Sequence, residues 1–326
     1  MINLNTTILS KPRFTFEGEY DRVVQKGNVG TSYVYALQLY RSHTCVLRGR
    51  RNDNSSIVKI NSSQEVDLTG SAGGHTQTWE YAGSAAQNNF NGDWFIGTKG
   101  QRASDGYDWD IQLARIHFPT SANDNTQLVR LSHLNQVGTA GFDGAAYRTE
   151  AAVTPDYRRL MIVALDDSKN AHFGLFDLAT INGRLNGVQT SGSKQGHVPL
   201  NEVTSLASFT IPAITNTIPS LQGFDIDNRN NIYVSCQPHP VWPKGQRGPR
   251  QIVKIPWGET ESSNWYVANY NGYNSDLDIS GYYTEFEGVQ VIDEDSLYLT
   301  VAYHHANKSL LTDKNKIFKI SGFQTY

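Results

Sequence analysis

Short runs in which apolar and polar residues alternate recur along the whole chain, and turn-forming residues separate them. Residues 221–227 (LQGFDID) alternate strictly, residues 228–230 (NRN) are typical of a turn, and residues 232–235 (IYVS) begin a second run. Alternation with a period of two predicts strands that are buried on one face. The same order returns near the end of the chain, in residues 286–291 (FEGVQV), 297–303 (LYLTVAY) and 316–320 (KIFKI).

A Glu or Gln lies at the beginning of each of five such series. The five positions are Gln25, Gln77, Glu150, Gln222 and Glu287. A repeat of this length that fills the whole sequence is typical of a β-propeller, with one sheet per repeat. We therefore predict an all-β, five-bladed β-propeller with about four antiparallel strands per blade. It would be a single domain over residues 1–326, with repeats starting near residues 23, 75, 148, 220 and 285.

A propeller exposes a sheet edge unless strands from both chain ends complete one blade. Residues 13–17 (RFTFE), or residues 6–9, are predicted to pair near the strand at residues 317–320. Residues 209–211 (FTI) and 265–270 (WYVANY) are candidates for fourth strands. A helix longer than two turns is expected only at residues 178–185.

The five Glu and Gln side chains begin what should be the innermost strands, where they would form a ring of three amides and two carboxylates. One interpretation is a binding site for a sugar, a cation or water, because these groups both donate and accept hydrogen bonds. The other is that each side chain satisfies backbone groups of the neighbouring blade, since buried N–H groups need partners. Small residues directly after the polar one fit both interpretations: Ala151, Gly223 and Gly288.

Histidines form a second candidate group. His75 lies two residues before Gln77, which places both on one face of a strand, and Trp79 follows. His239, His304 and His305 each follow the second strand of a repeat, so they could converge with His75, Trp79 and Trp242. Zinc would need three such ligands in a closed geometry, but the chain has no HxH or HExxH pattern. We predict no metal and no cofactor, and add His75, Trp79 and His304 to the candidate binding residues.

Catalysis has one candidate pair. Glu150 and Glu287 could be the acid and base of a glycoside hydrolase, which needs two carboxylates at a fixed separation. The exchange of Glu and Gln between repeats favours structural equivalence instead, and the sequence has no GxSxG, phosphate loop or CxxC. We assign no catalytic residue, and an enzyme is the less favoured interpretation.

Composition and charge limit the classes of molecule that the protein is expected to bind. The formal net charge is −3, from 28 basic and 31 acidic residues, which disfavours nucleic acid as a partner. No apolar run is long enough for a membrane helix, and the N-terminus (MINLNTTILSKPRF) lacks the features of a secretory signal. Cys45 and Cys236 are expected to be apolar fillers, with a single disulfide as the alternative.

Several segments resemble the helveticin J family, the large heat-labile bacteriocins of lactobacilli. The resemblance extends over about residues 23–320, and its most specific motifs are VVQKGNVG from Val23 and AGGHTQTWE from Ala72. Further motifs are SYVYALQL from Ser32, WFIG from Trp94, EAAVTPDY from Glu150, QGFDIDNRNNIYVS from Gln222, QIVKIPW from Gln251 and LTVAYH from Leu299.

The resemblance implies an extracellular antibacterial protein that acts at the envelope of related Gram-positive bacteria, and it supplies no catalytic residues. An aromatic, amide-rich surface is compatible with binding an envelope glycan or teichoic acid without turnover. Two alternatives stay open: a glycoside hydrolase using Glu150 and Glu287, and a surface lectin without toxicity. The sequence does not give the oligomeric state or the receptor.

Overall fold

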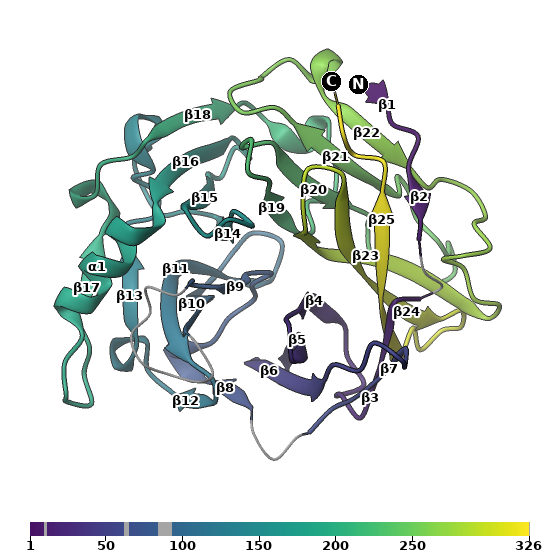
Figure 1. Cartoon of the computed structure of the whole chain (residues 1–326), viewed down its shortest axis with the longest axis horizontal. Helices are drawn as coiled ribbons and strands as arrows, with labels where there is room; N and C mark the ends of the chain where they lie inside the picture. Colours follow the sequence, from purple (N-terminus) through teal and green to yellow (C-terminus); the bar gives the residue numbers. More distant parts are fainter. Residues whose placement is uncertain (10–11, 62–64, 84–92, 326) are drawn as a thin grey trace. The chain divides into compact units, whose positions relative to one another are not determined.

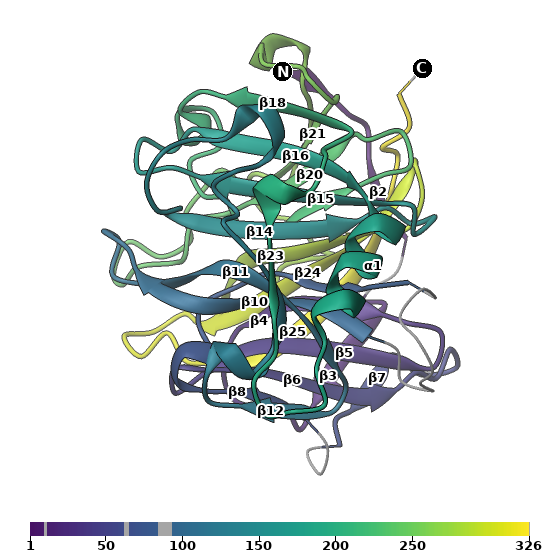
Figure 2. The ribbon, with the colours of Figure 1, turned by 90° about the vertical axis from the view of Figure 1, so that its left-hand side faces the viewer.

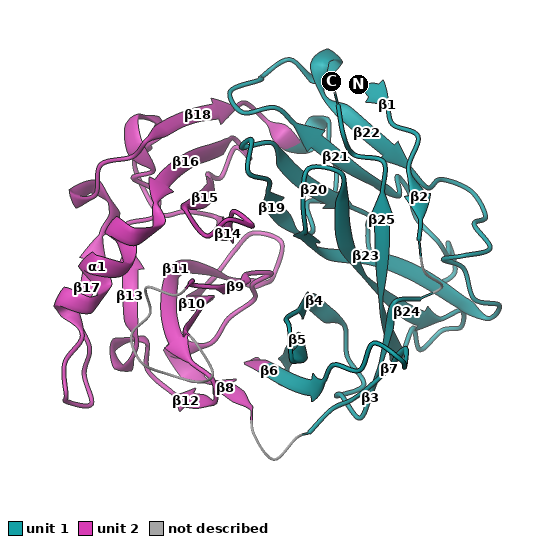
Figure 3. Ribbon diagram, in the orientation of Figure 1, with its two compact units in different colours: residues 1–40, 46–64, 215–326 teal, residues 41–45, 65–214 magenta. Residues whose placement is uncertain are grey.

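The computed structural model describes residues 1–9, 12–61, 65–83 and 93–325. Strands dominate these residues and form five sheets of four to six strands. The sheets are the blades of a five-bladed β-propeller, which confirms the predicted fold class (Figure 1). The chain divides into two compact units (Figure 3): unit 1 is residues 1–40, 46–64 and 215–326, and unit 2 is residues 41–45 and 65–214. The prediction of a single domain stays a prediction.

Unit 1 contains two whole sheets. The first has the order β1-β22-β21-β20-β19. Its strands are β1 (Ile2–Asn3), β22 (Tyr266–Asn269), β21 (Gln251–Ile255), β20 (Ile232–Cys236) and β19 (Phe224–Ile226). The second has the order β23-β24-β25-β3-β7, with β2 also paired to β25. Its strands are β23 (Tyr282–Val291), β24 (Ser296–His305), β25 (Thr312–Ser321), β3 (Phe14–Glu17), β7 (Ile57–Lys59) and β2 (Thr7–Ile8).

Unit 2 also contains two whole sheets. One has the order β17-β13-β11-β10-β9. Its strands are β17 (His197–Pro199), β13 (Val129–Ser132), β11 (Asp108–His117), β10 (Asp93–Arg102) and β9 (Trp79–Tyr81). The other has the order β14-β15-β16-β18, and Figure 2 shows these strands one above the other. Its strands are β14 (Arg148–Val153), β15 (Arg159–Leu165), β16 (Ala171–Asp177) and β18 (Ala207–Ile211).

The fifth sheet has the order β12-β8-β6-β5-β4. Its strands are β12 (Thr120–Ala122), β8 (Val66–Leu68), β6 (His43–Arg50), β5 (Tyr33–Tyr40) and β4 (Val24–Val29). The pair β8 and β12 belongs to unit 2, and β4 and β5 belong to unit 1.

Both predicted N-terminal segments pair with the last strand. Thr15 of β3 is opposite Lys316 of β25, and Ile8 of β2 is opposite Ile320. Figure 1 shows β2 running beside β25. The sheet is thus completed by strands from both chain ends, as predicted, and both of the alternative segments take part.

The other local predictions are also confirmed. The proposed fourth strands are β18 and β22, and the one α-helix among the described residues is α1 (Leu178–Val188). Asp177 begins it, because its carboxylate accepts a hydrogen bond from the backbone N of Thr180 at 2.7 Å. Ile181 and Leu185 of α1 are fully buried in the core of unit 2. Cys45 and Cys236 are buried free thiols, as expected of apolar fillers.

Two glycines of unit 1 are required by close backbone approach. A Cβ on Gly223 would lie 2.5 Å from the Cα of Gly288, and a Cβ on Gly288 would lie 2.8 Å from the backbone O of Gln25. No side chain fits at such separations, and backbone atoms cannot swing away as a flexible side chain can. The small residues after the inner polar positions Gln222 and Glu287 therefore have a steric cause.

We expect Gly223→Ala to destabilise the protein by about 1–3 kcal/mol or more, because the added methyl overlaps the backbone of Gly288. Gly183→Ala is the matched control: a Cβ there meets nothing within 4 Å in the middle of α1, so it should stabilise by about 0.5–1 kcal/mol. Thermal unfolding of both variants measures the two effects. A Gly223→Ala melting temperature equal to that of the wild type would contradict the steric argument.

Candidate functional site

Glu150, in the middle of β14, is a buried carboxylate with several donors around it. The backbone N of Gln77 lies 3.1 and 3.0 Å from its two oxygens, Thr78 Oγ1 donates at 2.6 Å, and Arg148 Nε donates at 3.0 Å. Gln77 and Thr78 directly precede β9, which begins at Trp79. For Glu150, the structure therefore favours the interpretation in which the side chain satisfies backbone groups of a neighbouring sheet.

Asp110, on β11, is a second buried carboxyl in the same region, and sequence reasoning missed it. Its side chain is inaccessible to solvent, and neither carboxyl oxygen has a hydrogen-bond partner among the described residues. Burial raises the pKa of Asp110 well above its usual range, and the negative charge of Glu150 raises it further. Asp110 therefore holds its proton more strongly than a solvent-exposed aspartic acid does.

His75 and Trp79, both predicted as binding residues, lie in different surroundings. The ring of His75 stacks on Trp109, with centroids 4.1 Å apart, and it is 9% exposed. Trp79 is completely buried and stacks on Trp94 at 4.6 Å. Trp79 thus contributes to packing in unit 2, and its role in binding stays a prediction.

The three inner polar residues of unit 1 also differ from one another. Gln25 lies at an irregularity of β4, where the register with β5 shifts between Val24 and Lys26. Glu287 lies within a similar shift in β23, between Phe286 and Val289, and is 1% exposed. Gln222 extends to the side chain of Glu285, to which its Nε2 donates at 3.1 Å.

A cluster of two histidines, a carboxylate and an amide forms around Glu285 of β23. His239 Nδ1 and His304 Nε2 lie 2.7 and 2.9 Å from Glu285 Oε2, and Gln222 Nε2 donates to Glu285 Oε1 at 3.1 Å. We call these four residues the histidine cluster. Side-chain exposure is 7% for Glu285, 1% for His304 and 50% for His239. The cluster is therefore buried on one side and open at His239.

Charge stabilises the cluster. Burial alone would raise the pKa of Glu285, but hydrogen bonds from His239 and His304 outweigh it and lower that pKa. The hydrogen bond to Glu285 raises the pKa of His239. Glu285 is therefore an ionised carboxylate held between two imidazoles.

Strand geometry explains why these residues meet. Tyr283 is opposite His304 in the β23–β24 ladder, and Glu285 lies two residues further on the same face. His239 follows β20, and Gln222 precedes β19 in the neighbouring sheet. Sequence analysis identified His304 and Gln222 but missed Glu285. The feature of the sequence that could have pointed to Glu285 is its position two residues before Glu287.

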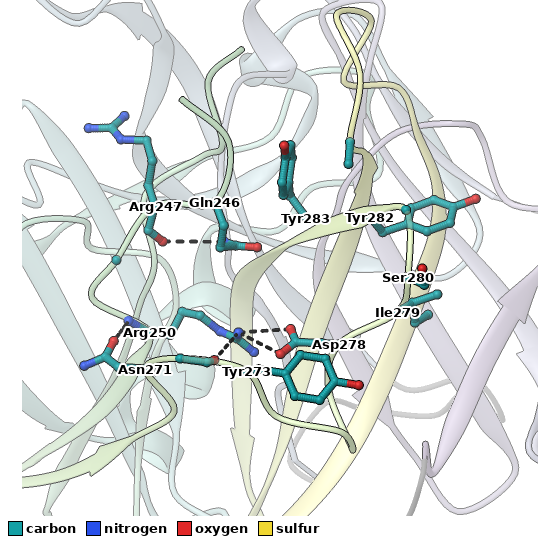
Figure 4. Close-up of a pocket in the computed structure, with 14 residues that line it drawn as sticks. Gln246, Arg247, Arg250, Asn271, Tyr273, Asp278, Ile279, Ser280, Tyr282 and Tyr283 are labelled. Atoms are coloured by element: carbon teal, nitrogen blue, oxygen red, sulfur yellow. Dashed lines mark hydrogen bonds and ion pairs between the residues drawn. The ribbon is translucent and has the colours of Figure 1, made fainter. Parts of the chain in front are cut away.

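A pocket of about 720 Å³ lies in unit 1, on the loops that precede β21 and β23. Figure 4 shows three tyrosines at this pocket, Tyr273, Tyr282 and Tyr283. Arg250 Nη1 donates to Asp278 Oδ1 at 3.0 Å and to the backbone O of Gly272 at 3.2 Å. The pocket thus combines aromatic rings with polar groups that the protein holds in place.

The chain matches the family model described as bacteriocin helveticin-J over residues 3–324. It is also 37% identical to bacteriocin helveticin-J of Lactobacillus helveticus, over 98% of each chain.

The chain belongs to the bacteriocin helveticin-J family.

Solved structures are far more distant from this helveticin-J family chain. A Dyadobacter fermentans protein of unknown function is 8% identical, with a TM-score of 0.36 over 89% of this chain and 72% of its own. The WD40 domain of Toxoplasma gondii coronin is 10% identical, with a TM-score of 0.32 over 98% of this chain and 86% of its own. Among the described residues, no helix has the length and apolar character needed to span a membrane.

Asp110 gives this family member a testable pH dependence. Its raised folded-state pKa means that the folded state keeps a proton that the unfolded chain releases above about pH 4. Stability from this group is complete below that pH and declines as the pH rises toward the folded-state value. We expect Asp110→Asn to remove this decline, which gives a gain of about 1–3 kcal/mol at pH 8 relative to pH 4.

Thermal unfolding of wild type and Asp110→Asn from pH 4 to 8 measures this effect, with the exposed Asp143 changed to Asn as the control. Parallel stability curves for wild type and Asp110→Asn would show that the buried carboxyl is already compensated.

Proposed function

We propose that the protein is released from the producing cell and kills related Gram-positive bacteria by binding an envelope glycan without turnover. Membership of the bacteriocin family supports the antibacterial function. The observation that carries the binding proposal is the tyrosine-lined pocket of unit 1.

Sugar recognition needs flat apolar surfaces, because pyranose rings present C–H faces that stack on aromatic rings. Tyr273 is 84% exposed, so its ring is available to stack on a sugar. Tyr282 and Tyr283 are half-buried neighbours on β23 and line the same pocket. The volume of about 720 Å³ is that of a site for a small saccharide.

Polar groups at the pocket suit sugar hydroxyls. Gln246, Asn271, Asp278 and Arg250 line it and offer both donors and acceptors. The Nε and Nη2 atoms of Arg250 are buried and have no hydrogen-bond partner among the described residues. Burying a donor without a hydrogen-bond partner costs free energy. A polar group of a ligand or of solvent would therefore accept hydrogen bonds from these two nitrogens.

Binding without turnover is favoured over hydrolysis by the state of the two carboxylates considered for catalysis. Glu150 is 3% exposed, and Gln77, Thr78 and Arg148 already donate to it. Glu287 is 1% exposed. A glycosidase needs one carboxyl that reaches the glycosidic oxygen and another that reaches the anomeric centre or a water, and neither side chain presents an open face for this.

We expect Tyr273→Ala to weaken binding to purified cell walls of a sensitive strain about three- to tenfold, because one stacking ring is lost. Killing, measured by colony counts, should fall in parallel. Tyr157→Ala is the matched control: Tyr157 is 51% exposed, belongs to unit 2 and is not among the residues that line the pocket. Binding and killing that are equal for the two variants would exclude this pocket as the site.

Two further measurements separate the alternatives. Under the hydrolase hypothesis, Glu287→Gln abolishes killing and wild-type protein releases reducing sugar from cell walls. Under our proposal, Glu287→Gln keeps both fold and killing, and no sugar is released. Wall binding without any loss of viable cells would instead identify a lectin without toxicity.

A further inference from the structure

The histidine cluster has the composition and spacing of a transition-metal site. His239 Nδ1, His304 Nε2 and a carboxylate oxygen of Glu285 all lie within 4.8 Å of one another. They come from three segments, the loop after β20 and the strands β23 and β24, so one ion would contact all three. Two imidazoles and one carboxylate are a common ligand set for zinc, which leaves a fourth position open.

Partners behind the ligands fix their orientation. His304 Nδ1 lies 2.8 Å from Thr312 Oγ1, so its Nε2 is directed toward Glu285. Gln222 Nε2 holds the other oxygen of Glu285 and also donates to the backbone O of Gln237 at 3.0 Å. Metal-binding histidines and carboxylates usually have such outer partners, which preset the ring and the carboxylate.

We propose that His239, Glu285 and His304 bind a zinc ion. The ion replaces the protons that now lie between Glu285 Oε2 and the two imidazoles, which are 2.7 and 2.9 Å away. Zinc at about 2.1 Å from each ligand needs ligand atoms about 3.4 Å apart, so Glu285 Oε2 has to move away from His239 Nδ1 by roughly 0.7 Å and from His304 Nε2 by roughly 0.5 Å. His239 permits this because its side chain is 50% exposed and can move outward by a small side-chain rotation.

Zinc would fasten the loop of residues 237–250 to the sheet. This loop is already bound to β23 by Gln237, whose Nε2 donates to the backbone O of Thr284 at 2.7 Å, and by Gln246, whose Nε2 donates to the same oxygen at 2.8 Å. His239 lies between these two anchors. The site is separate from the sugar pocket proposed above, and zinc binding is measured without reference to killing.

The test is calorimetric titration of ZnCl₂ into the full chain without a histidine tag, after chelator treatment and dialysis. We expect one zinc ion per chain and a higher melting temperature at saturating zinc, because the ion binds the folded state. His239→Ala should weaken the affinity at least tenfold, and Glu285→Gln should do the same. His305→Ala is the matched control, because this neighbouring histidine contacts Asp313 instead.

A second measurement distinguishes loss of a metal ligand from loss of the fold. Cobalt replaces zinc in such sites, and its visible absorption reports direct ligation by nitrogen and oxygen. We expect this absorption in the wild type and in His305→Ala, and its loss in His239→Ala, whose exposed position leaves the fold intact. Absence of zinc binding by the wild type overturns the proposal, and so does equal affinity in His239→Ala, since the ion would then bind elsewhere.

Discussion

Backbone groups at the inner ends of the sheets need hydrogen-bond partners that the β-ladders do not supply, and side chains of other segments provide them. The amide of Gln237 accepts from the backbone N of Phe286 at 3.0 Å and donates to the backbone O of Thr284 at 2.7 Å, as a paired strand would. Gln290 pairs in the same way with Val29, accepting from its N at 2.7 Å. The carboxylate of Glu150 accepts a hydrogen bond from the backbone N of Gln77 at 3.0 Å. Unsatisfied backbone groups here would cost about 1–3 kcal/mol each, so the inner positions must be polar.

The same requirement generates the histidine cluster. The side-chain amide of Gln222 donates a hydrogen bond to the backbone O of Gln237 and another to the carboxylate of Glu285. A carboxylate placed there cannot stay buried alone, because an isolated buried charge is expensive. His239 and His304 compensate it and, in doing so, bring two imidazoles onto one oxygen. The histidine cluster therefore consists of groups whose first role is to provide hydrogen-bond partners for buried polar atoms.

The limits of sequence reasoning follow from this arrangement. Alternation identifies strands because period and burial are local properties, and the need to cover a sheet edge predicts that residues 13–17 or 6–9 pair with the last strand. It does not reveal which side chain crosses to another sheet. Glu287 has the right residue type, but Glu285, two residues earlier on the strand, makes the contacts with the histidines. No pattern in the sequence singles out Asp110. The pocket is built from loops such as residues 271–281, which have no periodicity to interpret.

The loop of residues 237–250 connects the two proposed sites physically. It supplies His239 to the histidine cluster, and Gln246, Arg247 and Arg250 line or border the pocket. On the strand side, Tyr283 lines the pocket while Glu285, two residues on, faces the histidines. Any interaction that fixes His239 therefore restricts the same loop that shapes the pocket. Ligand binding at the pocket then costs less conformational entropy, because the loop is already ordered. A rigid loop at this position favours recognition over the mobility that catalytic closure would require.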